Sequence, residues 1–531
     1  DINAVFTYGT DSIAHPSANI RYNISEGQLE LSRGENGSDR NLFFSSAHNI
    51  NINTDYIIAN INTDTIFIGK KTARILGKEP VTFQSLNFFN KREYESLEGL
   101  AGVNPLVMLM RLYRRNGNNP IVPANQVLSV YSNRLTKESL ASFLFSLSEQ
   151  GFVSYDQEKE LVEIKEKAKH YVEAYYEQRD YDRLRIKSDT LDINGYFNVK
   201  DKAISVRGVK NLEISPARRV GVLPKNNQII LKPGMDFDFG GTLFAGYSDF
   251  QGTDFHFDYL PFQVKMDSID QFRFFPPTKD PYEFPNPPAY ALTSKLENMN
   301  GTLYVDSTFN KSGLDTVASY PLFKTNDVSY IYYDDSTVVA DTVYKRDSFY
   351  FEVAPFEFPG LQRYLKEDIA FEGQLVSAGI FPPFKDTAIV RDDYSLGFIH
   401  ETPTDGYVTY DGQGLYQGII DLSNKGLTGK GKLAYLGSVI ESTDFIFRPD
   451  GATSSAQAFD LPESRGGEVE TPLVHADKVT MDFKPYQDSM YIRSEEFQLF
   501  PEQEHSLKGV LTLTTQGVKG EGTLKWDKAE L

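Results

Sequence analysis

The sequence predicts a mainly β, multidomain protein of antiparallel sandwich or meander modules, with one small α+β domain inserted. Three observations predict this class. Short apolar runs with a period of two, broken by Asn, Asp, Thr and Gly, fill most of the chain. A helical period of 3.6 residues occurs in one stretch, between about residues 86 and 182. With 531 residues, the chain also exceeds the roughly 250–300 at which one hydrophobic core stops growing.

The composition argues against several classes of function. The 54 Lys and Arg against 73 Asp and Glu leave a net charge of −19, whereas nucleic-acid binding needs a basic surface. The sequence has no cysteine, which excludes disulfides, thiolate metal sites and a cysteine nucleophile. No run approaches the roughly 20 apolar residues of a membrane span. The missing cysteines and a start at Asp1 without an initiator Met lead us to expect an exported protein, periplasmic or on the surface of a Gram-negative cell.

Residues 1–85 are expected to form a β-rich domain. Apolar residues occur in short runs around positions 50–52, 56–58 and 66–68, separated by polar turn residues. This spacing of about ten residues is typical of an antiparallel sandwich or meander.

Residues 86–182 are expected to form the helical domain. Leu106, Leu109, Met110 and Tyr113 follow the i, i+3, i+4, i+7 pattern, which recurs at 140–147 and 168–175. The pair at 104–105 (Asn-Pro) predicts the start of the first helix, and Thr136 that of the second. Alternating apolar residues at 153–164 predict a hairpin. This order of elements resembles a winged helix, but helix 136–150 carries too few cations to hold phosphates, which favours protein docking or a spacer role.

The remaining chain returns to strands. We expect a β-rich domain over 183–275, a proline-rich extended connector over 276–288, and duplicated β-modules over 289–531.

The duplication rests on a glycine pattern that recurs at a constant offset of 91 residues. Each copy reads as a strand, a tight turn and a return strand, with the third and fourth glycines marking a bulge or a close backbone approach. The paired positions are Gly418, Gly426, Gly429 and Gly431 in one copy and Gly509, Gly517, Gly520 and Gly522 in the other.

The search for catalytic motifs mostly fails, so we expect a protein that is not an enzyme. No histidine pair has metal-ligand spacing, and no nucleophile elbow or phosphate loop is present. Asp236 and Asp238 point to one side of a strand and offer oxygen ligands for Ca²⁺, the one cofactor considered; the alternative is a solvated strand face. His256 is interpreted as a half-buried strand residue rather than a general base.

Tyrosines concentrate near residue 330. Tyr330, Tyr332 and Tyr333 are candidate contacts for a glycan or a protein partner, because exposed tyrosines provide rigid contact area with a polar tip. The alternative is that they pack in a core.

Two glycine- and aromatic-rich segments, 239–246 and 393–398, resemble parts of large, uncharacterised β-rich cell-envelope proteins of Bacteroidota. This resemblance implies an exported, outer-membrane-associated protein that works with other envelope proteins, and it implies no catalytic residues.

Three functions therefore stay open. The first is a non-enzymatic scaffold or partner-binding subunit of the envelope. The second is a glycan-binding or adhesive surface protein, and the third is a carbohydrate-active enzyme whose carboxylates are distant in sequence.

Overall fold

The computed structural model describes residues 2–34, 41–69, 80–100, 103–131, 135–190, 193–284, 286–334, 343–466, 470–500, 505–526 and 529–530. Strands take 52% of the residues and helices 13%, which confirms the mainly β class. The chain divides into two compact units. Unit 1 contains residues 1–270, 300–324 and 357–363, and unit 2 contains 271–299, 325–356 and 364–531.

Unit 1 begins with an antiparallel sheet whose members come from both sides of the helical stretch. Its neighbours are ordered β1–β2–β4–β5–β8–β12. The last pair joins Phe83 to Ile186, so residues about 100 positions apart are adjacent in the sheet. The strands are β1 (Ile2–Tyr8), β2 (Asp11–Asn23), β4 (Phe43–Ser45), β5 (Ile50–Asn53), β8 (Val81–Ser85) and β12 (Arg185–Ser188).

A second sheet packs against the first. The far end of β2 starts it, and the order continues β3–β6–β7–β13–β14–β17–β18. Phe197 of the second sheet contacts Tyr8 and His48 of the first, with ring centroids 5.2 and 5.4 Å apart. The strands are β3 (Gln28–Ser32), β6 (Tyr56–Asn60), β7 (Thr65–Ile68), β13 (Gly195–Asn198), β14 (Ala203–Arg207), β17 (Gln228–Leu231) and β18 (Phe237–Ala245).

This second sheet extends beyond β18. Strand β18 pairs with both β16 and β19, β15 pairs with β16, and β22 pairs with β25. The strands are β15 (Leu212–Ser215), β16 (Val220–Pro224), β19 (Ser248–Asp258), β20 (Gln263–Phe274), β21 (Leu296–Tyr304), β22 (Leu322–Thr325) and β25 (Glu357–Phe358).

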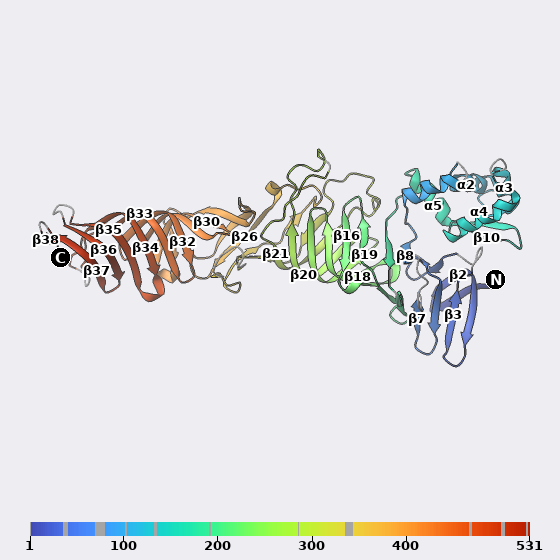
Figure 1. The fold of residues 1–531 in the computed structure, drawn as a ribbon, viewed down its shortest axis with the longest axis horizontal. Helices are drawn as coiled ribbons and strands as arrows, with labels where there is room; N and C mark the ends of the chain where they lie inside the picture. Colours follow the sequence, from blue (N-terminus) through green and yellow to red (C-terminus); the bar gives the residue numbers. More distant parts are fainter. Residues whose placement is uncertain are drawn as a thin grey trace. The chain divides into compact units, whose positions relative to one another are not determined.

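The helix-rich insert occupies the connection between β8 and β12 and has its own core (Figure 1). The expected helices and hairpin are present. Asn104 and Thr136 cap two of the helices, as predicted, and Thr136 forms a capping box with Ser139. The elements are α1 (Lys91–Ser96), η2 (Leu97–Leu100), α2 (Pro105–Arg115), β9 (Ile121–Pro123), α3 (Ala124–Val130), α4 (Lys137–Glu149), β10 (Val153–Asp156), β11 (Leu161–Ile164) and α5 (Glu166–Tyr175).

Strands β9, β11 and β10 form a three-stranded antiparallel sheet in that order. Among the helices of the described ranges, none has the length and apolarity needed to cross a membrane.

Unit 2 is an antiparallel meander in which most strands pair with the next strand in sequence (Figure 1). Its strands are β23 (Ser329–Tyr332), β24 (Phe349–Val353), β26 (Ala370–Ser377), β27 (Phe384–Val390), β28 (Leu396–Glu401), β29 (Tyr407–Thr409), β30 (Gly414–Ser423), β31 (Gly426–Tyr435), β32 (Ser438–Arg448), β33 (Gly451–Leu461), β34 (Val474–Lys484), β35 (Ser489–Leu499), β36 (His505–Thr514), β37 (Gly517–Trp526) and β38 (Ala529–Glu530). Short 3₁₀ turns punctuate both units: η3 (Lys225–Asn227), η4 (Pro233–Met235), η5 (Lys366–Asp368), η6 (Tyr410–Gly412) and η7 (Pro485–Gln487).

The repeat glycines lie in two hairpins with the same register. Gly418 pairs with Gly431 in β30–β31, and Gly509 pairs with Gly522 in β36–β37. A Cβ on Gly418 would lie 2.3 Å from the Lys430 carbonyl oxygen, so the backbones approach as closely as the sequence predicted. The bulge expected at the return strand is also present, because the β31–β32 register shifts between Gly429 and Gly431. The turn glycines Gly426 and Gly517 pair with Ser423 and Thr514, and Gly429 and Gly520 pair with Ile420 and Leu511. The duplication of whole 90-residue modules stays a prediction.

The proline-rich segment 276–288 contains no strand among its described residues, but it is not extended. The Thr278 amide donates to the Pro288 carbonyl, and the Tyr290 amide donates to that of Pro276. The predicted extended connector is therefore wrong for this segment: backbone hydrogen bonds between its two ends fold it back on itself.

Candidate functional site

A groove of about 1470 Å³ lies in unit 1 between the insert and the sandwich. One wall is the outer face of the insert's small sheet. Ser154 and Asp156 of β10 lie opposite Glu163 and Leu161 of β11, and Ile121 of β9 lies opposite Glu163. The alternate residues of these strands face the insert core, since a strand points successive side chains to opposite faces.

The opposite wall is the outer face of the first sandwich sheet. Ala14, Phe44 and Asn51 line it, and they are cross-strand neighbours on β2, β4 and β5. Leu86 and Leu260 complete the lining where the insert leaves the sandwich. Two faces of different sheets thus enclose the groove.

A buried hydrogen-bond network fastens both ends of the insert beside this groove. The Asp182 carboxylate accepts hydrogen bonds from Ser85 Oγ (2.6 Å), Tyr259 Oη (2.7 Å) and the Leu184 amide (2.9 Å). Tyr259 Oη also accepts from Asn87 Nδ2. Burial raises the pKa of Asp182, and these donors offset part of that effect. The network ties the start and the end of the insert to the β19–β20 turn.

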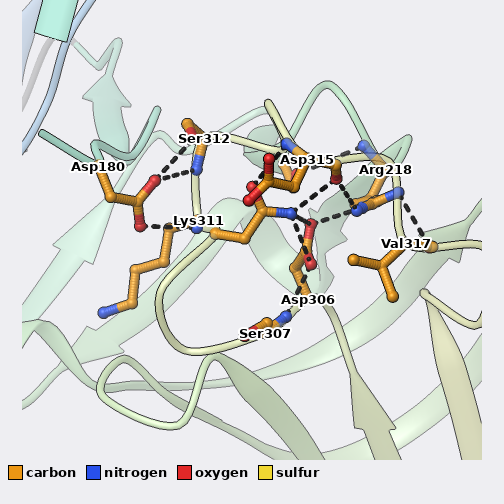
Figure 2. A network of polar contacts seen from close by, with 10 residues as sticks. Asp180, Arg218, Asp306, Ser307, Lys311, Ser312, Asp315 and Val317 are labelled. Atoms are coloured by element: carbon orange, nitrogen blue, oxygen red, sulfur yellow. Dashed lines mark hydrogen bonds and ion pairs between the residues drawn. The ribbon is translucent and has the colours of Figure 1, made fainter. Parts of the chain in front are cut away.

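A second network lies where the chain leaves the insert (Figure 2). The Asp180 carboxylate accepts from the Lys311 amide and from the Ser312 amide and hydroxyl. Behind this loop, Arg218 Nε lies 2.5 Å from Asp306 Oδ2, and both side chains are almost fully buried.

The Arg218 guanidinium also donates to two main-chain carbonyls, those of Asp315 and Val317. Asn310 Nδ2 and the Ser307 amide donate to the Asp306 carboxylate. The Arg218 contacts fix the loop 306–317 against the turn that carries Arg218, and the Asp180 contacts join the same loop to the end of the insert (Figure 2). We interpret this network as structural: it holds the end of the insert in place and does not form a reactive site.

Most carboxylates of the groove are engaged in ion pairs. Asp156 pairs with Lys159 (2.8 Å), Glu163 pairs with Lys165, and Glu166 pairs with Arg179 (3.1 Å). The hydrogen bond from Lys159 lowers the pKa of Asp156, so this group is a poor proton donor at neutral pH.

Asp236 differs from these groups. Its carboxylate accepts from the Tyr259 amide (2.8 Å), and burial raises its pKa. Ligand atoms of Asp236, His256 and Asp258 lie within 4.8 Å of one another. This cluster is the one group of three or more His, Asp or Glu with metal-binding geometry among the described residues.

The two aspartates proposed as Ca²⁺ ligands both lie beside His256. Asp236 joins His256 and Asp258, whereas Asp238 pairs with His256 Nδ1 (2.5 Å) and Lys232 Nζ (2.5 Å). Lys265 pairs with Asp258 at 2.9 Å. Lys232 and Lys265 thus each pair with one carboxylate, Asp238 and Asp258 respectively, and Ca²⁺ prefers six to eight oxygen ligands. The Ca²⁺ assignment stays a prediction.

The tyrosine candidates in unit 2 fall on two faces. Tyr330 and Tyr332 stack with ring centroids 5.9 Å apart, and Tyr350 of the neighbouring strand contacts both. The Arg346 guanidinium lies 4.1 Å from the centre of the Tyr332 ring. Tyr333 is buried and donates to the Leu396 carbonyl, so it is a core residue and does not share the surface ladder.

Sequence reasoning missed a relay in unit 2. His400 Nδ1 lies 2.8 Å from Asp386 Oδ2, and His400 Nε2 lies 2.9 Å from Tyr407 Oη. The Phe384 ring stacks on His400 at 4.1 Å. Burial, and next the Asp386 charge, raise the pKa of Tyr407, which opposes a tyrosinate nucleophile. The register of the β27–β28 hairpin was the signal that could have revealed this contact.

Comparison with known proteins gives no match: no family model fits the chain, and neither a curated protein nor a solved structure is similar to it. The function must therefore be argued from the groove, the clusters and the surface described above.

Proposed function

We propose that this chain is a non-enzymatic, exported partner-binding protein that holds a segment of another polypeptide in the groove between its insert and its sandwich. The observation that carries the proposal is the groove itself. Its volume of about 1470 Å³ exceeds the roughly 300–1,000 Å³ of small-molecule pockets, and its walls are two sheet faces held in place by buried hydrogen bonds.

The lining has the character of a protein interface. Leu86, Ile121 and Leu260 are 40%, 49% and 75% exposed there, and the surrounding charges are mostly paired with each other. Apolar anchors within a polar rim are the usual composition of a protein-binding surface. The expectation of an envelope location rests on composition and on the resemblance given above.

Site-specific photo-crosslinking in cells tests this function. We replace Leu260 by a photoreactive phenylalanine analogue, and place the same analogue at Ile24 as a control, since Ile24 is 82% exposed and does not line the groove. We expect a discrete protein adduct from position 260 only, which a second change, Ile121→Asp, abolishes. Equal labelling at both positions, or no adduct at 260, would contradict the proposal.

A second candidate, glycan binding, is favoured by the surface ladder of Tyr330, Tyr332 and Tyr350. Stacked tyrosines beside an arginine match the flat, hydroxylated faces of sugars. Replacing Tyr330 and Tyr332 by Ala should weaken retention on an envelope polysaccharide column, with Tyr491→Ala, also on the surface of unit 2, as the control. Unchanged retention would remove this candidate.

A carbohydrate-active enzyme is the least favoured of the three functions. Three of the four carboxylates in the groove are ion-paired, which leaves Asp236 as the carboxylic acid with a raised pKa. Glycoside hydrolysis normally requires two such groups in defined roles.

A further inference from the structure

A second cavity, of about 840 Å³, lies in unit 1 between α1, α5 and the strands β8 and β12. Leu42 and Lys167 line both this cavity and the groove, whereas Tyr171, Arg185 and Lys187 line the cavity and not the groove. The residues that matter are Gln84, Glu93, Lys167, Tyr171, Arg185 and Lys187.

Lys167 and Tyr171 lie one turn apart on α5, so their side chains share a face of the helix. Lys167 Nζ donates to the Gln150 carbonyl at 2.8 Å, and it lies 5.1 and 5.5 Å from the ring centres of Phe152 and Tyr171. Within the described ranges, no carboxylate is close enough to Lys167 to form an ion pair. This ammonium therefore lies among aromatic rings without an ion-pair partner in the described ranges, and Glu93 acts on it without a direct contact.

Tyr171 is 1% exposed, and its hydroxyl makes no hydrogen bond of good geometry among the described residues; the Gln84 side chain is a weak partner at most, and its Oε1 already accepts from Arg185 Nη2 (3.4 Å). Leaving a buried hydroxyl unpaired costs on the order of 1–3 kcal/mol. Native proteins rarely leave such groups unpaired unless water, an ion or a ligand satisfies them.

The wall opposite α5 carries further cations. Arg185 pairs with Glu93 through two contacts of 2.6 and 2.9 Å, stacks on Phe88 at 4.0 Å, and keeps a buried Nε without a partner among the described residues. Lys187 lies two residues further along the same face of β12. The lining holds four cations, Arg33, Lys167, Arg185 and Lys187, against three carboxylates, Asp55, Glu93 and Glu149, so it carries a small excess of positive charge in a chain whose net charge is −19.

We propose that this cavity binds an oxyanion, namely the phosphate or carboxylate group of a small molecule, through Lys167, Tyr171 and the Arg185–Lys187 edge of β12. Such a group accepts hydrogen bonds from an ammonium and a hydroxyl at once, and charge-assisted hydrogen bonds of this kind are the strong ones. It would give the Lys167 ammonium an ion-pair partner and the Tyr171 hydroxyl a hydrogen-bond acceptor.

The lowered pKa of the Lys167 ammonium supports the proposal. Burial, and next the charge of Arg185, lower the pKa of Lys167 to about 7, while Glu93 opposes the shift. A bound anion favours the ammonium form, so binding should take up protons near pH 7 and weaken as the pH rises above it. The other charged groups that line the cavity are Arg33, Asp55, Glu93, Glu149, Arg185 and Lys187.

Isothermal titration calorimetry on the full chain tests the proposal, with inorganic phosphate and succinate as probes and chloride at matched ionic strength as the reference. We expect one of the two probes to bind at pH 6.5 with proton uptake, measured by comparing buffers of different ionisation enthalpy. Binding of phosphate alone or succinate alone identifies the source of the oxyanion.

Three variants locate the site. We expect Lys167→Met to weaken binding at least tenfold and to abolish the proton uptake, and Tyr171→Phe to weaken it about fivefold with uptake retained. Lys169→Met, which removes an ammonium of the same helix that pairs with Glu166, should leave binding unchanged. The proposal is overturned if neither probe binds, or if Lys167→Met and Tyr171→Phe bind the probe as tightly as the parent chain and Lys169→Met do.

Discussion

The two units bury different kinds of polar group. The residues of unit 1 that are at most 2% exposed include charged residues and histidines, such as Asp182, Arg218, Asp306, His48 and His170. Among the described residues of unit 2, the equally buried polar ones are serines and threonines: Ser329, Ser377, Ser395, Thr409, Ser438 and Ser442.

This difference follows from how each unit is assembled. Unit 2 is a meander of neighbouring hairpins, so a buried hydroxyl that is hydrogen-bonded has its partner close in sequence, as Ser438 has at the Tyr435 carbonyl. The hydroxyls of Ser329 and Thr409 make no hydrogen bond among the described residues, which a neutral group tolerates better than a charged one. A buried charge needs several fixed partners, and unit 1 obtains them by bringing distant segments together, as with Arg218 and Asp306. The groove and the cavity proposed to bind an oxyanion both lie in unit 1, where buried charged side chains have fixed partners.

The largest expected effect tests whether unit 1 depends on its buried charges. Asp306→Ala leaves Arg218 buried and unpaired, so we expect a loss of about 3–5 kcal/mol in the free energy of unfolding. Urea denaturation followed by circular dichroism at 222 nm reports on unit 1, because the described α-helices lie there.

The paired replacement of Arg218 by Met and Asp306 by Leu should recover a large part of that loss, since neither charge then remains buried. A loss no greater than that of Ser307→Ala, at the rim of the same network, would show that the ion pair is dispensable.

The second expected effect is a difference between the two units in how much stability they lose in acid. Burial lowers the pKa of His48 from an ordinary 6.5 to about 4, so the folded state favours neutral imidazole. The unfolded chain then binds the extra proton, and unit 1 loses stability as the pH falls from about 6.5 towards 4, by on the order of 2–3 kcal/mol. Hydrogen exchange at pH 7.5 and pH 4.5 measures this in each unit separately.

The matched variant is His48→Gln. It should be less stable than the parent chain at pH 7.5, because the hydrogen bonds to Ser45 and the Lys202 carbonyl depend on the imidazole. We expect this gap to narrow at pH 4.5; a constant gap would assign the acid sensitivity to other groups.

The stability of unit 2 should be most sensitive to substitutions where two backbones approach each other closely. Gly418 has φ +146°, and a Cβ there would lie 2.3 Å from a carbonyl oxygen of the neighbouring strand. Gly418→Ala should therefore cost about 2 kcal/mol. The fluorescence of Trp526, the sole tryptophan of the sequence, reports on unit 2, and Gln417→Ala at the exposed neighbouring position should change little. Equal stability of the two variants would contradict the close approach.

The smallest expected effect is a gain in stability. Lys167→Met removes a buried ammonium and should stabilise unit 1 by about 1 kcal/mol at pH 6–7. Because the folded pKa of Lys167 is about 7 and that of an unfolded lysine about 10.5, the parent chain regains this stability as the pH rises from 7 to 10.5. The difference between the two melting temperatures should shrink and then change sign over that range, because the change in pKa from 10.5 to about 7 is worth more than the advantage of the variant at pH 6–7. A pH-independent difference would point to packing instead of charge.

Local features of this protein were predictable because they depend on neighbouring residues. Asn104 and Thr136 start helices as expected, and the 153–164 hairpin forms, since a cap or a tight turn involves only a few consecutive residues. The close pairing of Gly418 with Gly431 was visible for the same reason.

The candidate sites were less predictable. Asp236 and Asp238 were grouped because alternate strand residues share a face; both lie beside His256, whose position there no local pattern indicated. Tyr333 was grouped with Tyr330 by proximity, although adjacent strand residues point to opposite faces and Tyr333 packs in the core.

The sequence by itself determined the mainly β class, the helical insert and the glycine hairpins, because hydrophobic period and turn chemistry are local properties. Only the tertiary structure decided that β8 pairs with β12 across the insert, that Arg218 meets Asp306, and that two sheet faces enclose a groove. Arg218 and Asp306 are 88 positions apart in the sequence, and the paired residues of β8 and β12 are about 100 apart. No local pattern specifies such pairs; they form because burying the whole chain brings these segments together and then requires each buried charge to find a partner.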